Sequence, residues 1–284
     1  MRPMTTVRIL LAGTSTPAQG RLATRLADAA AELSVAIALV DVERLRLAID
    51  DPTAVIEHGL PYRGRLEEPL LIAGAAPRLW PLVRAVAAYH RRVLNDPRAI
   101  EANGWERLRA CATAGLPVLP VVVADGTAAE RLAPDLGGWP LLYRPLRHGE
   151  IGAPSGGTHG AYTALLPNGS TPFGVAETAL YAAGGEGVRP RRLLVADGTL
   201  VGAALLRPGY PATMAPTEAS VREVEIAVAA AAACQLAVAA VDIVGEATAP
   251  RIAEVDPLPG IMAWEDEMDL PAAAAWIGAA IAAR

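Results

Sequence analysis

The stretch AVAAVDIVGEATAPRIAEVDPLPGI, residues 237–261, is the most informative part of the sequence. It contains two apolar runs separated by a short polar turn, which predicts two neighbouring strands. Side chains two apart on a strand share a face, so Glu254 and Asp256 point together, and Asp242 on the paired strand can meet them. Three carboxylates on one face repel unless a cation lies between them, and Mg²⁺ takes oxygen ligands of this kind. The alternative is a set of surface acids at strand ends.

The composition limits the chemistry. The chain has 284 residues and a formal net charge of -5, and all 25 basic residues are arginine. The lack of lysine excludes a Schiff base or a phosphate-binding P-loop lysine. The two cysteines, Cys111 and Cys234, fall in helix-like stretches and indicate neither a disulfide framework nor a metal site. The negative charge and the absence of a basic cluster argue against a nucleic-acid partner.

The sequence predicts no membrane partner. The apolar run in MRPMTTVRILLAG is too short for a signal peptide. Residues 226–244 are apolar, but much of this stretch is alanine, and Gln235 and Asp242 interrupt it. A helix that runs into a strand is therefore predicted there. We expect a soluble, cytoplasmic protein, and a homo-oligomer stays compatible with the sequence.

The order of elements predicts an α/β (α+β) protein. A βαβ unit at the start is typical of a parallel sheet, and the second half adds antiparallel strands. The Asp197-Gly198 pair is a hairpin turn signal. Residues 43–69 are polar and irregular. Strands are expected at 7–13, 34–42, 69–74, 116–124, 138–146, 237–245 and 249–257, a hairpin at 191–209, and helices at 17–33, 77–94, 105–115, 220–236 and 271–284.

Four segments resemble the ATP-grasp superfamily, most closely its RimK-like and glutathione-synthetase-like carboxylate–amine ligases. They are VLNDPRAIEANGWERLRACATAGLPVLP (93–120), WPLLYRP (139–145), RRLLVADGTLVGAALLR (191–207) and VDIVGEATAPRIAEVDPLPGIMAW (241–264). The resemblance implies an ATP-grasp domain over 97–284, with subdomains of roughly 97–186 and 187–284. A small βαβ pre-ATP-grasp domain over 1–96 would precede it.

The resemblance also implies an activity. ATP would phosphorylate a small-molecule carboxylate, and an amine would attack the acyl phosphate to form an amide in cofactor or amino-acid biosynthesis. The cofactors would be ATP and Mg²⁺. The implied metal ligands are Asp242, Glu254 and Asp256, and the implied catalytic residues are Arg192 and Arg207. The implied nucleotide contacts are Arg144, Gly152, Gly156, Gly157 and Tyr181.

The chain departs from the family at two lysine positions, which here hold Asn103-Gly104 and Arg144. Either one phosphate contact is missing, or another arginine, such as Arg107 or Arg147, replaces the first lysine. A second hypothesis is therefore a degenerate ATP-grasp protein that acts as a non-catalytic binding module or subunit. A third is another nucleotide-dependent phosphotransferase on this fold. The acids of the run 264–267 are expected to form a solvated face or to recognise a cationic substrate.

Overall fold

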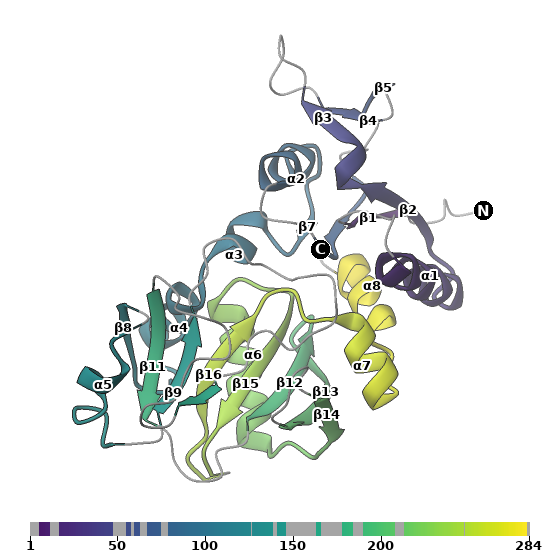
Figure 1. Cartoon of the computed structure of the whole chain (residues 1–284). Coiled ribbons are helices and arrows are strands. Elements are labelled where there is room, and N and C mark those ends of the chain that lie inside the picture. Colours follow the sequence, from purple (N-terminus) through teal and green to yellow (C-terminus); the bar gives the residue numbers. More distant parts are fainter. Residues whose placement is uncertain are drawn as a thin grey trace.

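The structure is a computed structural model of the whole chain. It describes residues 6–11, 17–47, 55–57, 60–62, 67–74, 79–125, 127–138, 141–145, 163–165, 178–183, 190–207, 213–246 and 248–282. The strands among these residues form four sheets, which Figure 1 shows together with the helices.

The N-terminal sheet is parallel, as the βαβ start predicts. Its order is β2 (Ala36–Asp41), β1 (Thr6–Leu11), β6 (Leu70–Ile72) and β7 (Val93–Leu94). Helix α1 (Pro17–Glu32) connects β1 to β2, and each neighbouring pair of strands runs parallel. The side chains of β6 are all buried, as expected for a strand covered on both faces.

Two expectations for this region are wrong in part. The segment expected to be irregular contains the 3-10 turn η1 (Val42–Arg44) and a sheet of β3 (Leu45–Leu47), β4 (Val55–Glu57) and β5 (Leu60–Pro61). Strands of two or three residues are too short to show a periodic pattern. The helix expected over 77–94 is only α2 (Trp80–Ala87), because the chain after it turns to pair β7 with β6.

A small antiparallel sheet follows two helices. Helix α3 (Pro97–Glu101) leads to α4 (Gly104–Thr113), which begins with a capping box between Asn103 and Glu106. The sheet has the order β10 (Thr163–Leu165), β9 (Leu141–Pro145), β11 (Thr178–Ala183) and β8 (Val121–Asp125), and α5 (Ala129–Leu132) follows β8.

The largest sheet has five antiparallel strands. Its order is β14 (Thr213–Pro216), β13 (Thr199–Arg207), β12 (Arg191–Ala196), β15 (Val238–Val244) and β16 (Arg251–Asp256). The predicted hairpin joins β12 to β13, and positive φ angles of 46° at Asp197 and 70° at Gly198 make its turn. The predicted pairing of β15 with β16 is also confirmed.

Helices cover both faces of this sheet. Helix α6 (Val221–Ala233) packs on one face together with α4. The last helices, α7 (Ile261–Met268) and α8 (Ala272–Ala282), lie between the five-stranded sheet and the N-terminal sheet (Figure 1). Helix α8 contacts α1, β1, β6 and β12, so one apolar core contains residues from both ends of the chain.

Asn95 joins the two regions through polar contacts. Its buried amide accepts hydrogen bonds from the backbone N–H groups of Ala237 and Val238 and donates to the carbonyls of Val238 and Pro257, at 2.7–3.1 Å. The segment expected as a helix running into a strand is α6 followed by β15. Among the described residues, no helix has the length and apolar character needed to cross a membrane.

Candidate functional site

The predicted acids lie on one face of the five-stranded sheet. In the strand register, Arg192 is opposite Asp242 and Asp242 is opposite Glu254, so the three residues form a row across β12, β15 and β16. Asp256 lies in the next row, opposite Ala240. The sequence therefore predicted correctly that the three acids share a face. Arg192, at the end of the row, was predicted as a catalytic residue, and its pairing with Asp242 was not predicted.

Arg192 binds Asp242 through two hydrogen bonds. Its Nε donates to Oδ1 at 2.7 Å and its Nη2 donates to Oδ2 at 2.8 Å, while Nη1 lies 3.8 Å from Oδ2 of Asp256. The three residues Arg192, Asp242 and Glu254 expose only 4%, 2% and 2% of their surface. Burial alone would lower the pKa of Arg192, but the carboxylates of Asp242, Asp256 and Glu254 raise it above its ordinary value. Arg192 is therefore a permanent buried cation.

We call Arg192, Asp242 and Glu254, together with Asp256 in the neighbouring row, the acid row. It lies between two regions of apolar packing on the same side of the sheet. On one side of the row, Leu194 and Ala240 belong to the core that includes α7 and α8. On the other side, Val244 and Ala253 pack with Leu142 of the small sheet. A buried row of charges between two packed regions is unfavourable for stability and is typical of a functional site.

Carboxylate oxygens are suitable ligands for a hard cation such as Mg²⁺. The three acids are not, however, arranged around a common point as a metal site would require. Among the described residues, no group of three or more His, Cys, Asp and Glu is arranged to hold a metal ion. Both oxygens of Asp242 accept hydrogen bonds from Arg192. Asp256 is the most accessible acid of the three, and its Oδ1 accepts a hydrogen bond from the N–H of Leu258 at 3.0 Å, which fixes its orientation.

The predicted nucleotide contacts are described only in part. Arg144 lies in β9 opposite Leu180, and Arg207 ends β13 opposite Thr213. The predicted contacts Gly152, Gly156 and Gly157 lie outside the described residues.

Tyr181, which the resemblance gave as a nucleotide contact, lies in a buried environment. Its side chain is fully buried, packs edge-to-face with Tyr143, and donates a hydrogen bond from its hydroxyl to the carbonyl of Asp125 at 3.0 Å. Burial raises the pKa of Tyr181 to about 12. In this structure the ring has a packing role, and no part of it is exposed to a ligand.

The position of the first missing lysine is occupied by a helix cap. Asn103 accepts a hydrogen bond from the N–H of Glu106, and its own N–H donates to the Glu106 carboxylate. Arg107 does not fill the gap, because it lies in the pocket beside Cys234 at the end of α6. Helix α6 covers the face of the sheet opposite to the acid row.

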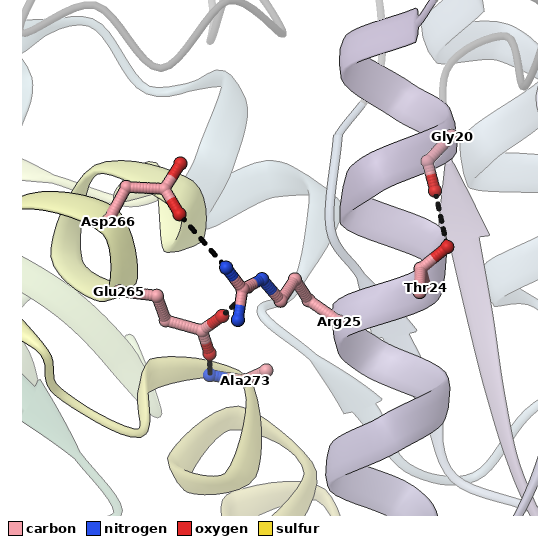
Figure 2. Close-up of polar contacts among 6 residues, drawn as sticks. All are labelled: Gly20, Thr24, Arg25, Glu265, Asp266 and Ala273. Carbon is pink, nitrogen blue, oxygen red and sulfur yellow. Dashed lines mark hydrogen bonds and ion pairs between the residues drawn. The ribbon is translucent and has the colours of Figure 1, made fainter.

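The acids that follow β16 have internal partners. Figure 2 shows Arg25 of α1 reaching two residues of α7, with its Nη2 3.1 Å from Asp266 and its Nε 3.6 Å from Glu265. Glu265 also accepts a hydrogen bond from the N–H of Ala273 in α8, and Glu267 accepts one from Met214 in β14. These acids connect α7 to three other elements, a role that neither expectation for this run included.

Comparison with solved structures identifies the class of fold. The chain has the fold of ATP-grasp ligases, and the similarity extends over nearly its whole length. The resemblance found in the sequence is thereby confirmed at the level of the fold. No protein-family model and no curated protein matches the sequence itself.

Three solved structures represent this similarity. The first is the ATP-grasp ligase PsnB in complex with a phosphomimetic variant of a minimal precursor, Mg and ADP, with a TM-score of 0.71, 14% identity and 99% of each chain covered. The second is a RimK domain ATP-grasp protein from Sphaerobacter thermophilus, with a TM-score of 0.64, 17% identity, and 96% of this chain and 98% of that chain covered. The third is D-alanine–D-alanine ligase from Bacillus anthracis complexed with ATP, with a TM-score of 0.61, 12% identity, and 98% and 96% covered.

Proposed function

We propose that this protein is an ATP-dependent ligase that uses Mg²⁺ and joins a carboxylate to an amine through an acyl phosphate. The observation that carries the proposal is the acid row, with Asp242 opposite Glu254 and Asp256 in the next row. The row lies on a fold shared with ATP-grasp ligases. A carboxylate is a poor electrophile, and phosphorylation gives it a leaving group.

We propose Glu254 and Asp256 as the first metal ligands. Mg²⁺ is commonly bound by one or two carboxylates together with substrate phosphates rather than by a cage made only of protein groups. Asp242 would join them only by giving up part of its pairing with Arg192. When bound, the ion would neutralise charge on the phosphates. The two carboxylates would position it, and Arg192 would limit the repulsion between the acids.

For the phosphates we propose Arg144 and Arg207, together with Gly152, Gly156 and Gly157. The chain contains no lysine, so its only permanent side-chain cations are arginines. A guanidinium can bind phosphate oxygens with two parallel hydrogen bonds. We further propose the domain division 1–96 and 97–284, with subdomains near 97–186 and 187–284. Each of the four sheets falls within one of these ranges.

For the substrates we propose a small-molecule carboxylate and a small-molecule amine. The similar structures include a ligase with a peptide and a ligase named for a small molecule. PsnB is complexed with the precursor peptide PsnA2, and another of the structures is a D-alanine–D-alanine ligase. A peptide that carries both the acid and the amine is therefore the alternative partner.

The test is ADP release by the purified chain with ATP, Mg²⁺ and pools of amino acids as both acid and amine. We expect ADP release that depends on both an acid and an amine. Hydroxylamine in place of the amine should trap the acyl phosphate as a hydroxamate. An absence of ADP release with every amino-acid pool and with peptide pools would contradict a ligase.

One observation favours a second function, a non-catalytic nucleotide-binding module. Both oxygens of Asp242 are engaged by Arg192, and both family lysines are absent. If the protein is such a module, ATP and Mg²⁺ should raise its melting temperature in a thermal shift experiment without ADP release. A ligand that prefers the native state stabilises that state. Stabilisation together with acid- and amine-dependent ADP release would exclude the module.

A further inference from the structure

The two cysteines of the chain lie in contact, although 123 positions separate them. Cys111 is in α4, and Cys234 is the C-cap residue directly after α6. Their Sγ atoms are 3.8 Å apart. The two thiols are thus neighbours by tertiary packing, on the face of the five-stranded sheet opposite to the acid row.

The two thiols differ in access. Cys111 is fully buried, whereas Cys234 is 8% exposed and lines a pocket of about 330 Å³ between α3, α4 and the end of α6. Arg98 and Arg107 line the same pocket. Cys234 therefore borders a space large enough for a small reagent, whereas Cys111 does not line this pocket.

The surroundings of the thiols differ as well. A hydrogen bond from Cys111 lowers the pKa of Cys234, and the charge of Arg107 lowers it further against the effect of burial. The same contact, with burial, raises the pKa of Cys111. The thiolate is the form that reacts with oxidants, so a lowered pKa favours reaction at Cys234, the more accessible of the two buried thiols.

We propose that Cys234 is an oxidation site for hydrogen peroxide and that Cys111 converts the product into a disulfide between α4 and α6. In the first step, the Cys234 thiolate attacks one peroxide oxygen, the O–O bond breaks, and with one proton the products are a sulfenic acid and water. In the second step, the Cys111 sulfur attacks Sγ of Cys234, the S–O bond breaks, and a second water leaves with the Cys111 proton. Overall, two thiols and one peroxide give one disulfide and two waters.

The limited access to the Cys234 thiol favours a small oxidant. Attack by an external disulfide needs its two sulfurs in line with the attacking thiolate, which a thiol exposed by only 8% disfavours. Peroxide is close to water in size and fits the pocket. The product would join two helices that pack on the same face of the sheet, and thiol reductants would reverse it.

The experiment treats the reduced, folded full-length chain with hydrogen peroxide. Intact mass spectrometry should show a loss of two hydrogens, and peptide mapping should show one cross-link between Cys111 and Cys234. Dithiothreitol should restore both thiols, and the oxidised chain should melt at a higher temperature, since a cross-link restricts the unfolded chain. Oxidised glutathione at the same concentration should react more slowly.

Two single variants separate the roles of the thiols. Cys111→Ala should leave Cys234 able to form a sulfenic acid that dimedone traps, whereas Cys234→Ala should leave Cys111 unreactive in the folded state. Circular dichroism checks that each variant is folded, and Cys111→Ser and Cys234→Ser repeat the test if either alanine variant is not. Two thiols that remain reduced in the folded wild-type chain under peroxide would overturn the proposal. So would equal dimedone labelling of the two single variants.

Discussion

At the scale of single residues, Arg192 determines the state of the acid row. Its two hydrogen bonds to Asp242 are buried, so both partners are removed from water. A buried ion pair adds little net stability over apolar residues of the same shape, but loss of one partner leaves an uncompensated charge. The pair therefore contributes fixed charge at this position rather than net stability.

Replacement of Arg192 should therefore be costly. We expect Arg192→Ala to lower the free energy of unfolding by about 3–5 kcal/mol, because Asp242 keeps its charge in a buried site. Urea unfolding measures this value. The control is Arg222→Ala, which breaks an exposed pair with Glu225 and should cost about 1 kcal/mol or less. Equal losses in the two variants would contradict the buried pair.

Replacement of Asn95 should also lower the free energy of unfolding, for a different reason from replacement of Arg192. Its side chain satisfies four backbone groups at the start of β15 and after β16, and it is 4% exposed. We expect Asn95→Ala to cost about 3 kcal/mol in urea unfolding, because an unsatisfied buried polar group costs about 1–3 kcal/mol. Asn103→Ala, which removes only the cap of α4, should cost about 1 kcal/mol. A smaller loss of unfolding free energy for Asn95→Ala than for Asn103→Ala would contradict the role of Asn95 in joining the N-terminal region to the five-stranded sheet.

At the scale of elements, a partly buried polar cluster joins the N-terminal strands. Arg8 of β1 donates to Glu68 at 2.6 Å and lies 5.4 Å from the centre of the Tyr62 ring. The Tyr62 hydroxyl lies 2.8 Å from Nε2 of His90, and Nδ1 of His90 lies 2.7 Å from the carbonyl of Glu68. Since a carbonyl accepts, Nδ1 carries the proton, and neutral His90 accepts from Tyr62.

This cluster should make stability depend on pH. Burial, together with the charge of Arg8, lowers the pKa of His90. The contribution of neutral His90 is fully present above its ordinary pKa of about 6.5 and is lost as the pH falls toward the lowered value. Urea unfolding between about pH 7.5 and 5 should show this loss in the wild type and less of it in His90→Gln. Parallel pH curves for the two proteins would rule out the role of His90.

The sequence predicts the longer helices and strands well. It predicts short strands, and contacts between residues far apart in the chain, poorly. The strand pair carrying Asp242 and Glu254 and the Asp197-Gly198 turn depend on local patterns, and both are confirmed. The strands β3, β4 and β5 have two or three residues and no such pattern. The contact of Arg192 with Asp242 depends on the pairing of β12 with β15, 50 residues apart, and the burial of Tyr181 depends on packing against Tyr143. Local patterns do not contain this information.

At the scale of the whole molecule, the first and last helices and strands of the described chain pack together. Helix α8 packs against α1 and β1, while Arg25 connects α1 to α7, so the N-terminal sheet and the five-stranded sheet share one core (Figures 1 and 2). The acid row lies beside this core, and Val244 beyond it contacts the small sheet. The fold therefore brings three regions of the chain close to the carboxylates that we propose for Mg²⁺.

The most direct test of the proposed function is calorimetry with a non-hydrolysable ATP analogue and Mg²⁺. The wild type should bind the analogue only when Mg²⁺ is present. Glu254→Gln, which keeps the shape of the side chain, should weaken binding by about tenfold or more, because a charge-assisted contact contributes about 1.5–3 kcal/mol. Glu225→Gln on the exposed side of α6 should bind as the wild type does. No binding by the wild type, or equal affinities for all three proteins, would contradict a Mg²⁺–nucleotide site at the acid row.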